Sequence, residues 1–363
     1  MNEFAHKQQN LQALVERHKL DGIVLKRVSS FAWATCGAAS YVNTAAGEGE
    51  AALLVTRKGR WLFTNNIEAP RLKQEEQLER QGWEFQVNPW YEPAQKLDKK
   101  ARGLKLGADC AFPGALDLSD EIALLRASLT PEEADRFRML GRLCARAMQK
   151  TVNALRPRQT EHEIASRLAR EAERLGVQAI VNLIATDERI FNFRHPLPTQ
   201  KKLENYALLV LCGRRAGLVC SISRLVHFGP LPEALRRKAE AVAQVDAALI
   251  AGTCPGRPIG EILQDGIEMY ARTGFAEEWK LHHQGGLAGY EPRELVARPG
   301  VSARAAALQA YAWNPSITGT KSEDTVLMSE KGIQNLTEME GWPAISTEIN
   351  GQTIMRPGIL EIL

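Results

Sequence analysis

The sequence predicts two domains, an α/β domain followed by an α+β domain. Its 363 residues exceed what one hydrophobic core usually holds. Through the first third of the chain, strand patterns alternate with helix patterns, which is typical of an open sheet with helices packed on it. A helix-start signal at residues 129–133 is followed by long helices and, from residue 178, by strands. We therefore place the domains at residues 1–128 and 129–363.

Elements of the first domain follow from apolar periodicity. Leu11, Leu14 and Val15 lie on one face of an amphipathic helix, and Gly82 ends a second, highly charged helix. A Lys-Gly turn joins two apolar runs into a hairpin. The expected helices span residues 4–18 and 70–81, and the expected strands span residues 22–25, 50–56, 60–64, 83–87 and 104–109.

The second domain opens with strong capping signals. Thr130 is a predicted N-cap followed by Pro131 at the first helical position, and Thr160 begins a capping box that Glu163 completes. Helices are expected at residues 131–155, 160–175, 232–251 and 259–273. Strands are expected at residues 181–186, 206–212 and 218–228, and again from residue 308 onward.

Composition argues against several classes of function. The formal net charge is +3 and the bases form no long run, so nucleic-acid binding is not expected. The apolar stretch at residues 206–212 is far too short to span a bilayer, and the first ten residues are polar, so we expect no membrane association and a cytoplasmic protein. The six cysteines form no CxxC pair, which favours reduced thiols.

Four segments of the second domain carry a resemblance to a known family. They are Phe191–Pro196, Leu211–Arg224, His282–Arg293 and Ala312–Thr325. Their order and spacing resemble the pita-bread superfamily, which holds creatinase, prolidase, aminopeptidase P and methionine aminopeptidase. The resemblance implies a creatinase-type α/β N-terminal domain and an α+β pita-bread domain.

The resemblance also implies where metals would bind. Metallopeptidases of this family hold two divalent metals through Asp, Asp, His, Glu and Glu. The matching positions of this chain are Val210 or Leu211, Ser221, His283, Asn314 and Glu323. One carboxylate cannot neutralise two dications, so we expect no dinuclear centre and no cofactor. The alternative is one divalent ion, zinc or manganese, on His283, Glu323 and a thiol of Cys212 or Cys220.

Histidines are the expected reactive groups. His195 matches the catalytic base of creatinase, which uses this fold without a metal. A neutral imidazole can take a proton from water and return it to a leaving nitrogen; alternatively, His195 only closes the turn before Pro196. Since adjacent strand residues face opposite sides, at most one of His282 and His283 should face the pocket. The family match selects His283 as catalytic and leaves His282 packed.

Further predicted site residues bind substrate. Tyr290 replaces the second catalytic His of the peptidases and is followed by Glu291, as in the family. Arg293 could hold a substrate carboxylate through a bidentate fork, or could pair with Glu291 or Glu294 instead. Arg224 and Asn314 complete the predicted substrate-binding set, which consists of Tyr290, Glu291, Arg293, Arg224 and Asn314.

Glu323 has two interpretations. A carboxylate freed from a metal can bind a cationic substrate group, and with Glu291 it would suit a guanidinium, amidine or ammonium. In the second interpretation Glu323 is already paired with Lys321 or Arg224.

The sequence therefore favours a metal-independent, creatinase-like hydrolase that cleaves a C–N bond of a small amino acid derivative, with His195, His283 and Glu323 as its catalytic residues. One alternative is a divergent Xaa-Pro aminopeptidase or dipeptidase with at most one metal, acting on short peptides. Another is a catalytically silent protein that binds peptides or a partner. A homodimer is expected, as is usual for this fold.

Overall fold

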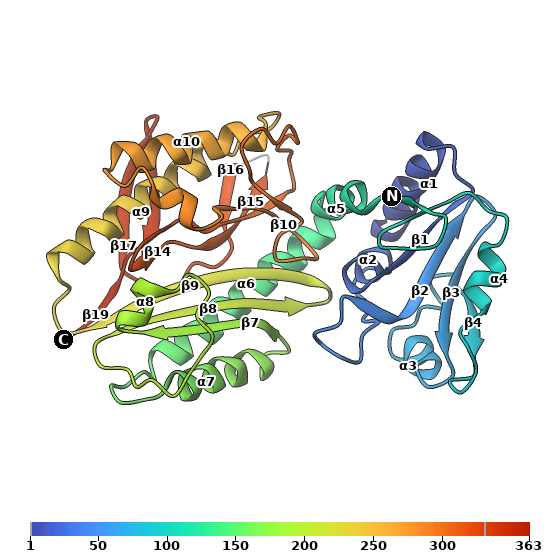
Figure 1. Cartoon of the computed structure of the whole chain (residues 1–363), viewed down its shortest axis with the longest axis horizontal. Helices are drawn as coiled ribbons and strands as arrows, with labels where there is room; N and C mark the ends of the chain where they lie inside the picture. The colour runs from blue at the N-terminus through green and yellow to red at the C-terminus, as the bar shows by residue number, and fades with distance from the viewer. Residues whose placement is uncertain (1, 330–331) are drawn as a thin grey trace. The chain divides into compact units, whose positions relative to one another are not determined.

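The computed structural model describes residues 2–329 and 332–363, in two compact units (Figure 1). One unit comprises Met1–Arg126 and Ala216–Leu218, and the other comprises Ala127–Arg215 and Val219–Leu363. The division falls two residues before the boundary that we placed from the sequence at 128/129.

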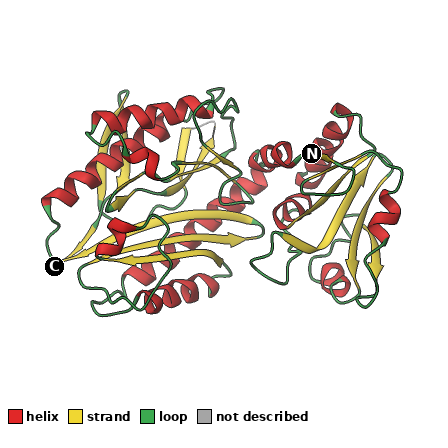
Figure 2. Ribbon diagram, viewed as in Figure 1, coloured by secondary structure: helices red, strands yellow, loops and turns green. Residues whose placement is uncertain are grey.

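The first unit is an α/β sheet with helices packed around it (Figure 2). Its strand order is β4-β3-β2-β1-β5-β6; β1, β2 and β3 are antiparallel, whereas β4, β5 and β6 join in parallel. The strands are β1 (Gly22–Arg27), β2 (Glu48–Thr56), β3 (Gly59–Asn65), β4 (Glu84–Asn88), β5 (Leu106–Ala108) and β6 (Leu116–Asp117). The helices are α1 (Glu3–Arg17), α2 (Val28–Ala34), α3 (Ala69–Gln74), α4 (Lys96–Ala101) and α5 (Ser119–Ala127).

One predicted helix of this unit is shorter than expected. The sequence predicts a helix over residues 70–81, but α3 ends at Gln74 and turns follow it. Gln77 has a positive φ of 53°, which is left-handed backbone that no α-helix continues through. The short helices α2, α4 and α5 lacked a periodic signal and were not predicted.

Helices of the second unit begin where the capping signals lie. Thr130 caps α6 (Pro131–Val152) and Thr160 caps α7 (Glu161–Glu173), each through a complete capping box with the glutamate three residues later. Both helices pack beside the sheet of β7–β9 (Figure 1). The remaining helices of this unit are α8 (Glu188–Asn192), α9 (Glu233–Gly252), α10 (Ile259–Arg272) and the 3₁₀ turn η1 (Glu278–Leu281).

Two sheets of the second unit carry the site. One has the order β19-β9-β8-β7 and the other β11-β10-β12-β15-β16, and β13–β14 and β17–β18 form separate hairpins. The strands are β7 (Gln178–Thr186), β8 (Tyr206–Arg215), β9 (Leu218–Phe228), β10 (Gly285–Ala288), β11 (Leu295–Val296), β12 (Ala310–Trp313), β13 (Ser316–Ile317), β14 (Thr320–Lys321), β15 (Asp324–Ser329), β16 (Gly332–Asn335), β17 (Ala344–Ile349), β18 (Gln352–Pro357) and β19 (Leu360–Ile362). A core of residues from α9, α10, β10, β12 and β15 holds the second sheet against its helices.

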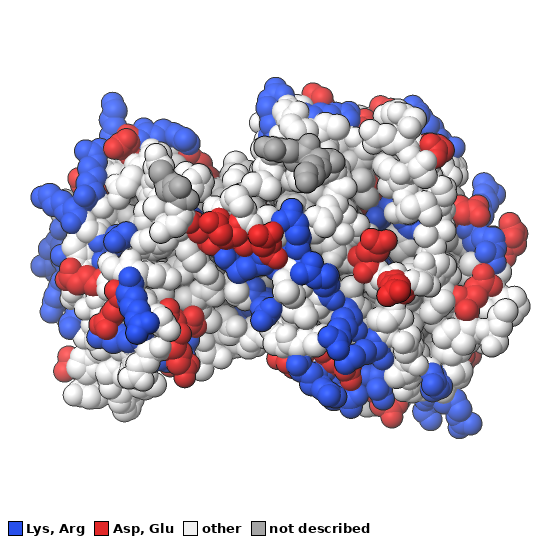
Figure 3. Space-filling model, turned by 180° about the vertical axis from the view of Figure 1, so that it is seen from behind, with Lys and Arg blue, Asp and Glu red and all other residues white. Residues whose placement is uncertain are grey.

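The surface carries both signs of charge. On the face seen in Figure 3, basic and acidic side chains are interspersed. Among the described residues, no helix is both long and apolar enough to cross a membrane.

Candidate functional site

Two sequence segments about a hundred residues apart meet at the site. Ser221 and Ser223 lie on β9, and Glu323 immediately precedes β15. The Ser223 backbone N–H donates to the Glu323 carbonyl at 3.2 Å, and the Ser221 N–H donates to the Thr325 hydroxyl at 2.9 Å. These bonds place the second and fourth segments of the family pattern side by side.

Glu323 is buried and fully engaged. One carboxylate oxygen accepts from the Arg293 guanidinium at 3.0 Å; the other lies 2.9 Å from the Lys321 ammonium and also accepts from the Ser223 hydroxyl. Burial alone would raise the pKa of Glu323, but Lys321, Arg293 and the Ser223 hydrogen bond outweigh it and lower the pKa to about 2. Glu323 is therefore ionised, and two protein cations hold it.

The second interpretation of Glu323 thus matches the structure in part. Lys321 is one partner, as expected, but the other is Arg293 rather than Arg224. Arg293 also donates to the Ser221 hydroxyl at 3.2 Å and to the Pro292 carbonyl at 2.6 Å. Its side chain is 10% exposed, and its buried Nε atom has no hydrogen-bond partner among the residues that the structure describes.

The donor set does not fit the two-metal centre that the fold family implies. Ser221 is neutral and contacts the Cys212 thiol at 3.2 Å, Asn314 is a neutral amide, and both Val210 and Leu211 are buried aliphatic residues. Glu323 supplies one negative charge, and Arg293 and Lys321 already lie at its two oxygens, where they would repel a dication.

Three histidines form a cluster in the same unit. The Nε2 atoms of His195 and His282 lie 3.1 Å apart, and the ring centroids of His282 and His283 lie 4.6 Å apart. One ligand atom from each of the three residues lies within 4.8 Å of the other two.

The prediction that His282 and His283 face opposite sides is wrong. The strand alternation on which it rested does not apply, because both residues lie between η1 and β10, outside any strand. His282 is buried and sits within the cluster, whereas His195 and His283 are exposed.

Partial burial of the ring atoms and nearby cations keep the three imidazoles neutral, although the whole residues His195 and His283 count as exposed. Burial, followed by the charge of Lys321, lowers the pKa of His282 to about 2. Burial and then Arg293 lower the pKa of His283 to about 4, and burial and Lys321 also lower the pKa of His195. Near pH 7 each ring therefore has one nitrogen free to accept a proton, and the Nε2–Nε2 contact needs one ring to donate.

Arg224 and Tyr290 are placed differently from their predicted substrate-binding roles. Arg224 is 2% exposed, and its guanidinium donates to Asp324 at 2.8 Å and to the Thr337 carbonyl at 2.9 Å. The Tyr290 hydroxyl is buried and donates to Glu133 at 2.6 Å. Both side chains are thus occupied by protein groups that sequence spacing did not indicate.

Asn314 and Glu291 keep more freedom. Asn314 is 3% exposed, and its backbone N–H donates to the Gln284 carbonyl at 3.0 Å. Within residues 2–329 and 332–363, its buried Oδ1 atom has no hydrogen-bond partner. Glu291 is partly exposed. Its backbone N–H donates to the Glu294 carboxylate at 3.2 Å, so Glu294 fixes this loop instead of pairing with Arg293.

The two candidate thiols face different neighbours. Cys212 touches Ser221, whereas Cys220 interacts with Cys144 of α6. Burial, and next the charge of Glu323, raise the pKa of Cys212 to about 11. Without a metal the Cys212 thiol is therefore protonated, so zinc would have to displace that proton to bind there.

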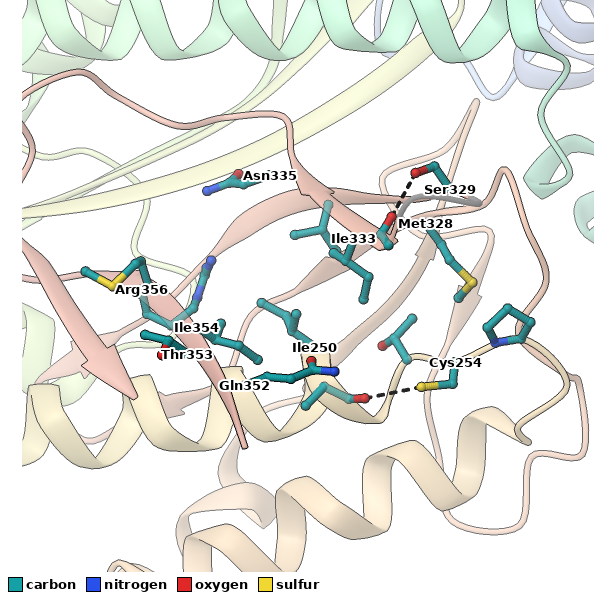
Figure 4. A pocket seen from close by; sticks show the side chains of 16 residues that line it. Ile250, Cys254, Met328, Ser329, Ile333, Asn335, Gln352, Thr353, Ile354 and Arg356 are labelled. Atoms are coloured by element: carbon teal, nitrogen blue, oxygen red, sulfur yellow. Dashed lines mark hydrogen bonds between the residues drawn. The ribbon is translucent and has the colours of Figure 1, made fainter. Parts of the chain in front are cut away.

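The second unit has one cavity at this site and another away from it. One, of about 420 Å³, is lined by His282 and His283 together with Trp279 and Arg298. The other, also of about 420 Å³, is lined by apolar side chains such as Ile250, Ile333 and Ile354 (Figure 4). It contains none of the predicted site residues.

Sequence reasoning undervalued Lys321 and His282. Lys321 was named as a partner of Glu323, but its proximity to the histidines was not foreseen. The signal for Lys321 was its position two residues before Glu323, and the signal for His282 was its adjacency to His283.

Comparisons with known proteins agree with this fold. The chain is similar to the Xaa-Pro dipeptidase from Bacillus anthracis, with a TM-score of 0.78, 17% identity, and coverage of 92% of this chain and 98% of that one. It is similar to the prolidase from Pyrococcus horikoshii OT3, with a TM-score of 0.79, 16% identity, and coverage of 92% and 99%. It is also similar to the N-terminal domain of FACT complex subunit SPT16 from chickpea (Cicer arietinum), with a TM-score of 0.73, 11% identity, and coverage of 94% and 97%.

These likenesses confirm the predicted architecture of an α/β domain followed by a pita-bread domain. The curated proteins gave no match. The model of metallopeptidase family M24 matches residues 135–330, which is more than half of the chain. This chain therefore belongs to metallopeptidase family M24.

Proposed function

We propose that this chain is a metal-independent, creatinase-like hydrolase that cleaves a C–N bond of a small amino acid derivative. Membership of family M24 supports a hydrolase of the peptidase type. The observation that carries the metal-independent part is the ion-paired state of Glu323. Arg293 and Lys321 stand at its oxygens, while neutral histidines lie nearby.

His195 is the acid–base group of this proposal. It is exposed, and its Nε2 atom contacts Nε2 of the buried His282 at 3.1 Å, which fixes the ring. The neutral imidazole takes a proton from water as the water oxygen attacks the carbon of the C–N bond. His195 then gives that proton to the leaving nitrogen as the bond breaks, so the proton count balances.

In this proposal, the side chains around Glu323 bind the substrate. The Nε atom of Arg293 lacks a partner among the described residues but is buried, so a substrate carboxylate reaches it only if the site opens. The buried Oδ1 of Asn314 could likewise accept an N–H from a substrate once the site opens. Because both oxygens of Glu323 are engaged, any cationic substrate group would rely on Glu291, while His283 lies beside His195 and can position the attacking water.

The decisive test measures hydrolysis of a panel of small amino acid derivatives with and without a chelator. We expect activity that a chelator does not change and that His195→Ala lowers by about 100- to 10,000-fold. The matched control is His162→Ala, since His162 is an exposed histidine on α7. Activity that is lost with the chelator and restored by manganese, cobalt or zinc would overturn metal independence.

A one-metal Xaa-Pro peptidase is the second candidate, which the likeness to prolidase and Xaa-Pro dipeptidase favours. It requires an ion shared by His283 and Glu323, with Arg293 and Lys321 displaced from the carboxylate. Metal analysis of protein purified without a chelator separates the two. About one tightly bound ion per chain, with cleavage of Xaa-Pro peptides, would support this candidate.

A binding protein without catalysis is the third candidate. The likeness to a domain of FACT complex subunit SPT16 favours it, because that protein is a subunit of a complex. If His195→Ala leaves the cellular phenotype intact while a pocket-filling substitution abolishes it, binding is the function. We further propose a cytoplasmic homodimer that acts on a small molecule or short peptide without nucleic acid; light scattering on the purified chain tests the dimer.

A further inference from the structure

We propose that His195, His282 and His283 form a binding site for a single zinc ion, and that zinc bound there inhibits the hydrolase. The binding part stands on geometry alone, whereas the inhibition part rests on the proposed function. This site differs from the two-metal centre implied by the fold family. That centre shares only His283 with the cluster and depends on carboxylates that this chain lacks.

The spacing of the nitrogens fits a tetrahedral ion. Zinc binds imidazole nitrogen at about 2.0–2.1 Å, so two ligands of a tetrahedral site lie about 3.3 Å apart. The Nε2 atoms of His195 and His282 lie 3.1 Å apart. One nitrogen from each of the three residues lies within 4.8 Å of the other two, so a small movement of His283 completes the set.

Hydrogen-bond contacts at the second nitrogens hold His282 and His283 in place. Nδ1 of His282 lies 3.3 Å from the Ser316 hydroxyl, and Nδ1 of His283 accepts from the Gly285 backbone N–H at 3.3 Å. Nε2 of His282 is therefore an available ligand, whereas Nε2 of His283 becomes one only after its proton moves to Nδ1, which gives up the 3.3 Å contact with Gly285. Such outer partners are typical of metal-binding histidines, whose second nitrogen is usually held by another group.

Exposure leaves room for a fourth ligand. His282 is 9% exposed and anchors the cluster, whereas His195 and His283 are exposed. Three histidines with one open position suit zinc, and a set of neutral nitrogens does not suit magnesium or calcium, which prefer oxygen. Arg293 and Lys321 together exceed Glu323 by one positive charge, so we expect reversible binding, weaker than that of a closed structural zinc site.

Inhibition follows from the lone pair that the metal takes. In the proposed reaction the acceptor nitrogen of neutral His195 takes the proton of water. Zinc on Nε2 uses the ring's one available lone pair and leaves the ring proton on Nδ1, so His195 can no longer accept a proton and hydrolysis stops. No covalent bond forms or breaks, and a chelator restores the free imidazole.

The test titrates zinc into the full chain after treatment with a chelator. We expect one ion per chain by calorimetry, and Co²⁺ in its place should give the visible absorption bands of four-coordinate cobalt. Replacing any one of the three ligands should weaken zinc binding by at least about 100-fold, in His282→Ala, His195→Ala and His283→Ala alike. Changes to residues that only hydrogen-bond a ligand already lower metal affinity by about 10- to 100-fold. Ser316→Ala should weaken it about tenfold.

Control variants make each outcome decisive. His162→Ala should leave zinc binding unchanged, and circular dichroism identifies any variant that fails to fold; the exposed His195 and His283 keep the test valid if His282→Ala misfolds. Absence of stoichiometric binding, or binding that all three substitutions leave intact, would overturn the site. In that case chelator-resistant activity would still leave the proposed function standing.

Activity measurements test whether bound zinc inhibits the hydrolase. Loss of hydrolysis at one zinc per chain, reversed by a chelator, supports inhibition. Stoichiometric zinc that activates the enzyme would overturn both inhibition and metal independence, while the site itself would stand. Stoichiometric zinc without effect on the rate would overturn inhibition alone.

Discussion

Replacing Glu323 with glutamine should strongly destabilise the protein. Its carboxylate is 2% exposed and is bonded to Arg293 and Lys321, so the amide would leave two nearly buried cations without their counter-ion. After the opposing effect of burial, the pKa of Glu323 is about 2 against an ordinary 4.5. That difference corresponds to about 3 kcal/mol of stability at neutral pH. The same magnitude is typical when one partner of a buried ion pair is removed.

The stability that Glu323→Gln removes should become smaller as the pH falls. A carboxyl whose pKa is lowered by folding contributes its stability above the unfolded value, and loses it as the pH falls. For Glu323 the contribution is complete above about pH 5 and declines from 4.5 through about 2. The difference between wild type and Glu323→Gln should therefore narrow as acid is added.

Urea unfolding at a series of pH values measures this difference. Glu188→Gln is the matched control, because Glu188 forms an exposed ion pair with Lys201 at 3.0 Å and should change stability little. Adding Lys321→Met to Glu323→Gln should cost less than the two single changes summed, because the pair is coupled. A loss below about 0.5 kcal/mol at pH 7, or one that grows in acid, would refute the charge argument.

Three other predictions concern single side chains. Because burial and Lys321 lower the pKa of His195, hydrolysis should stay constant near pH 7 and decline only below the ordinary histidine value of 6.5; a pH–rate profile with a midpoint above 6.5 would contradict this. A thiol reagent should modify the exposed Cys254 in the native protein and spare the buried Cys212, as mass spectrometry of the labelled protein would show; labelling of both at similar rates would argue against the packing. Tyr290→Phe should cost about 1–3 kcal/mol in urea unfolding, since it leaves the buried Glu133 carboxylate without that donor, and an unchanged stability would exclude this role.

The sequence predicted elements well where local chemistry determines them. The helix starts at Thr130 and Thr160 follow from capping boxes whose partners lie three residues away. Prediction was poorer where a helix depends on its surroundings. The charged segment 70–81 has helix-forming residues, but the backbone turns at Gln77 and the helix ends early.

For the site, the sequence indicated which residues would meet but not how they would pair. The order of the four segments predicted that Ser221, His283 and Glu323 belong to one region, and Ser221 and Glu323 do lie together on neighbouring segments. The ion pair of Arg293 with Glu323 joins residues 30 positions apart and depends on tertiary packing. The inward position of His282 was missed because a strand was assumed where the chain has none.

Around Glu323, the lost metal ligands are accompanied by two basic side chains that neutralise the remaining carboxylate. By resemblance, the family site balances four carboxylates against two dications. This chain retains one of those carboxylates and surrounds it with Arg293 and Lys321, so the local sum is one positive charge. A site that had only lost its ligands would leave Glu323 buried and unpaired, at a cost of several kcal/mol.

A pocket with one surplus positive charge should prefer anions. Arg293 has a buried Nε atom without a partner among the described residues, and Asn314 has a neutral acceptor where the family has a carboxylate. A ligand with a carboxylate and a neutral N–H therefore suits the site better than one with an ammonium group. N-acyl amino acids should therefore bind more tightly than the corresponding amino acid amides in calorimetry. Raising the ionic strength should reduce that preference, because salt screens it. Equal affinity for the two ligand classes, or tighter binding of the amides, would mean that Glu291 or another acid governs recognition and that the charge count around Glu323 does not.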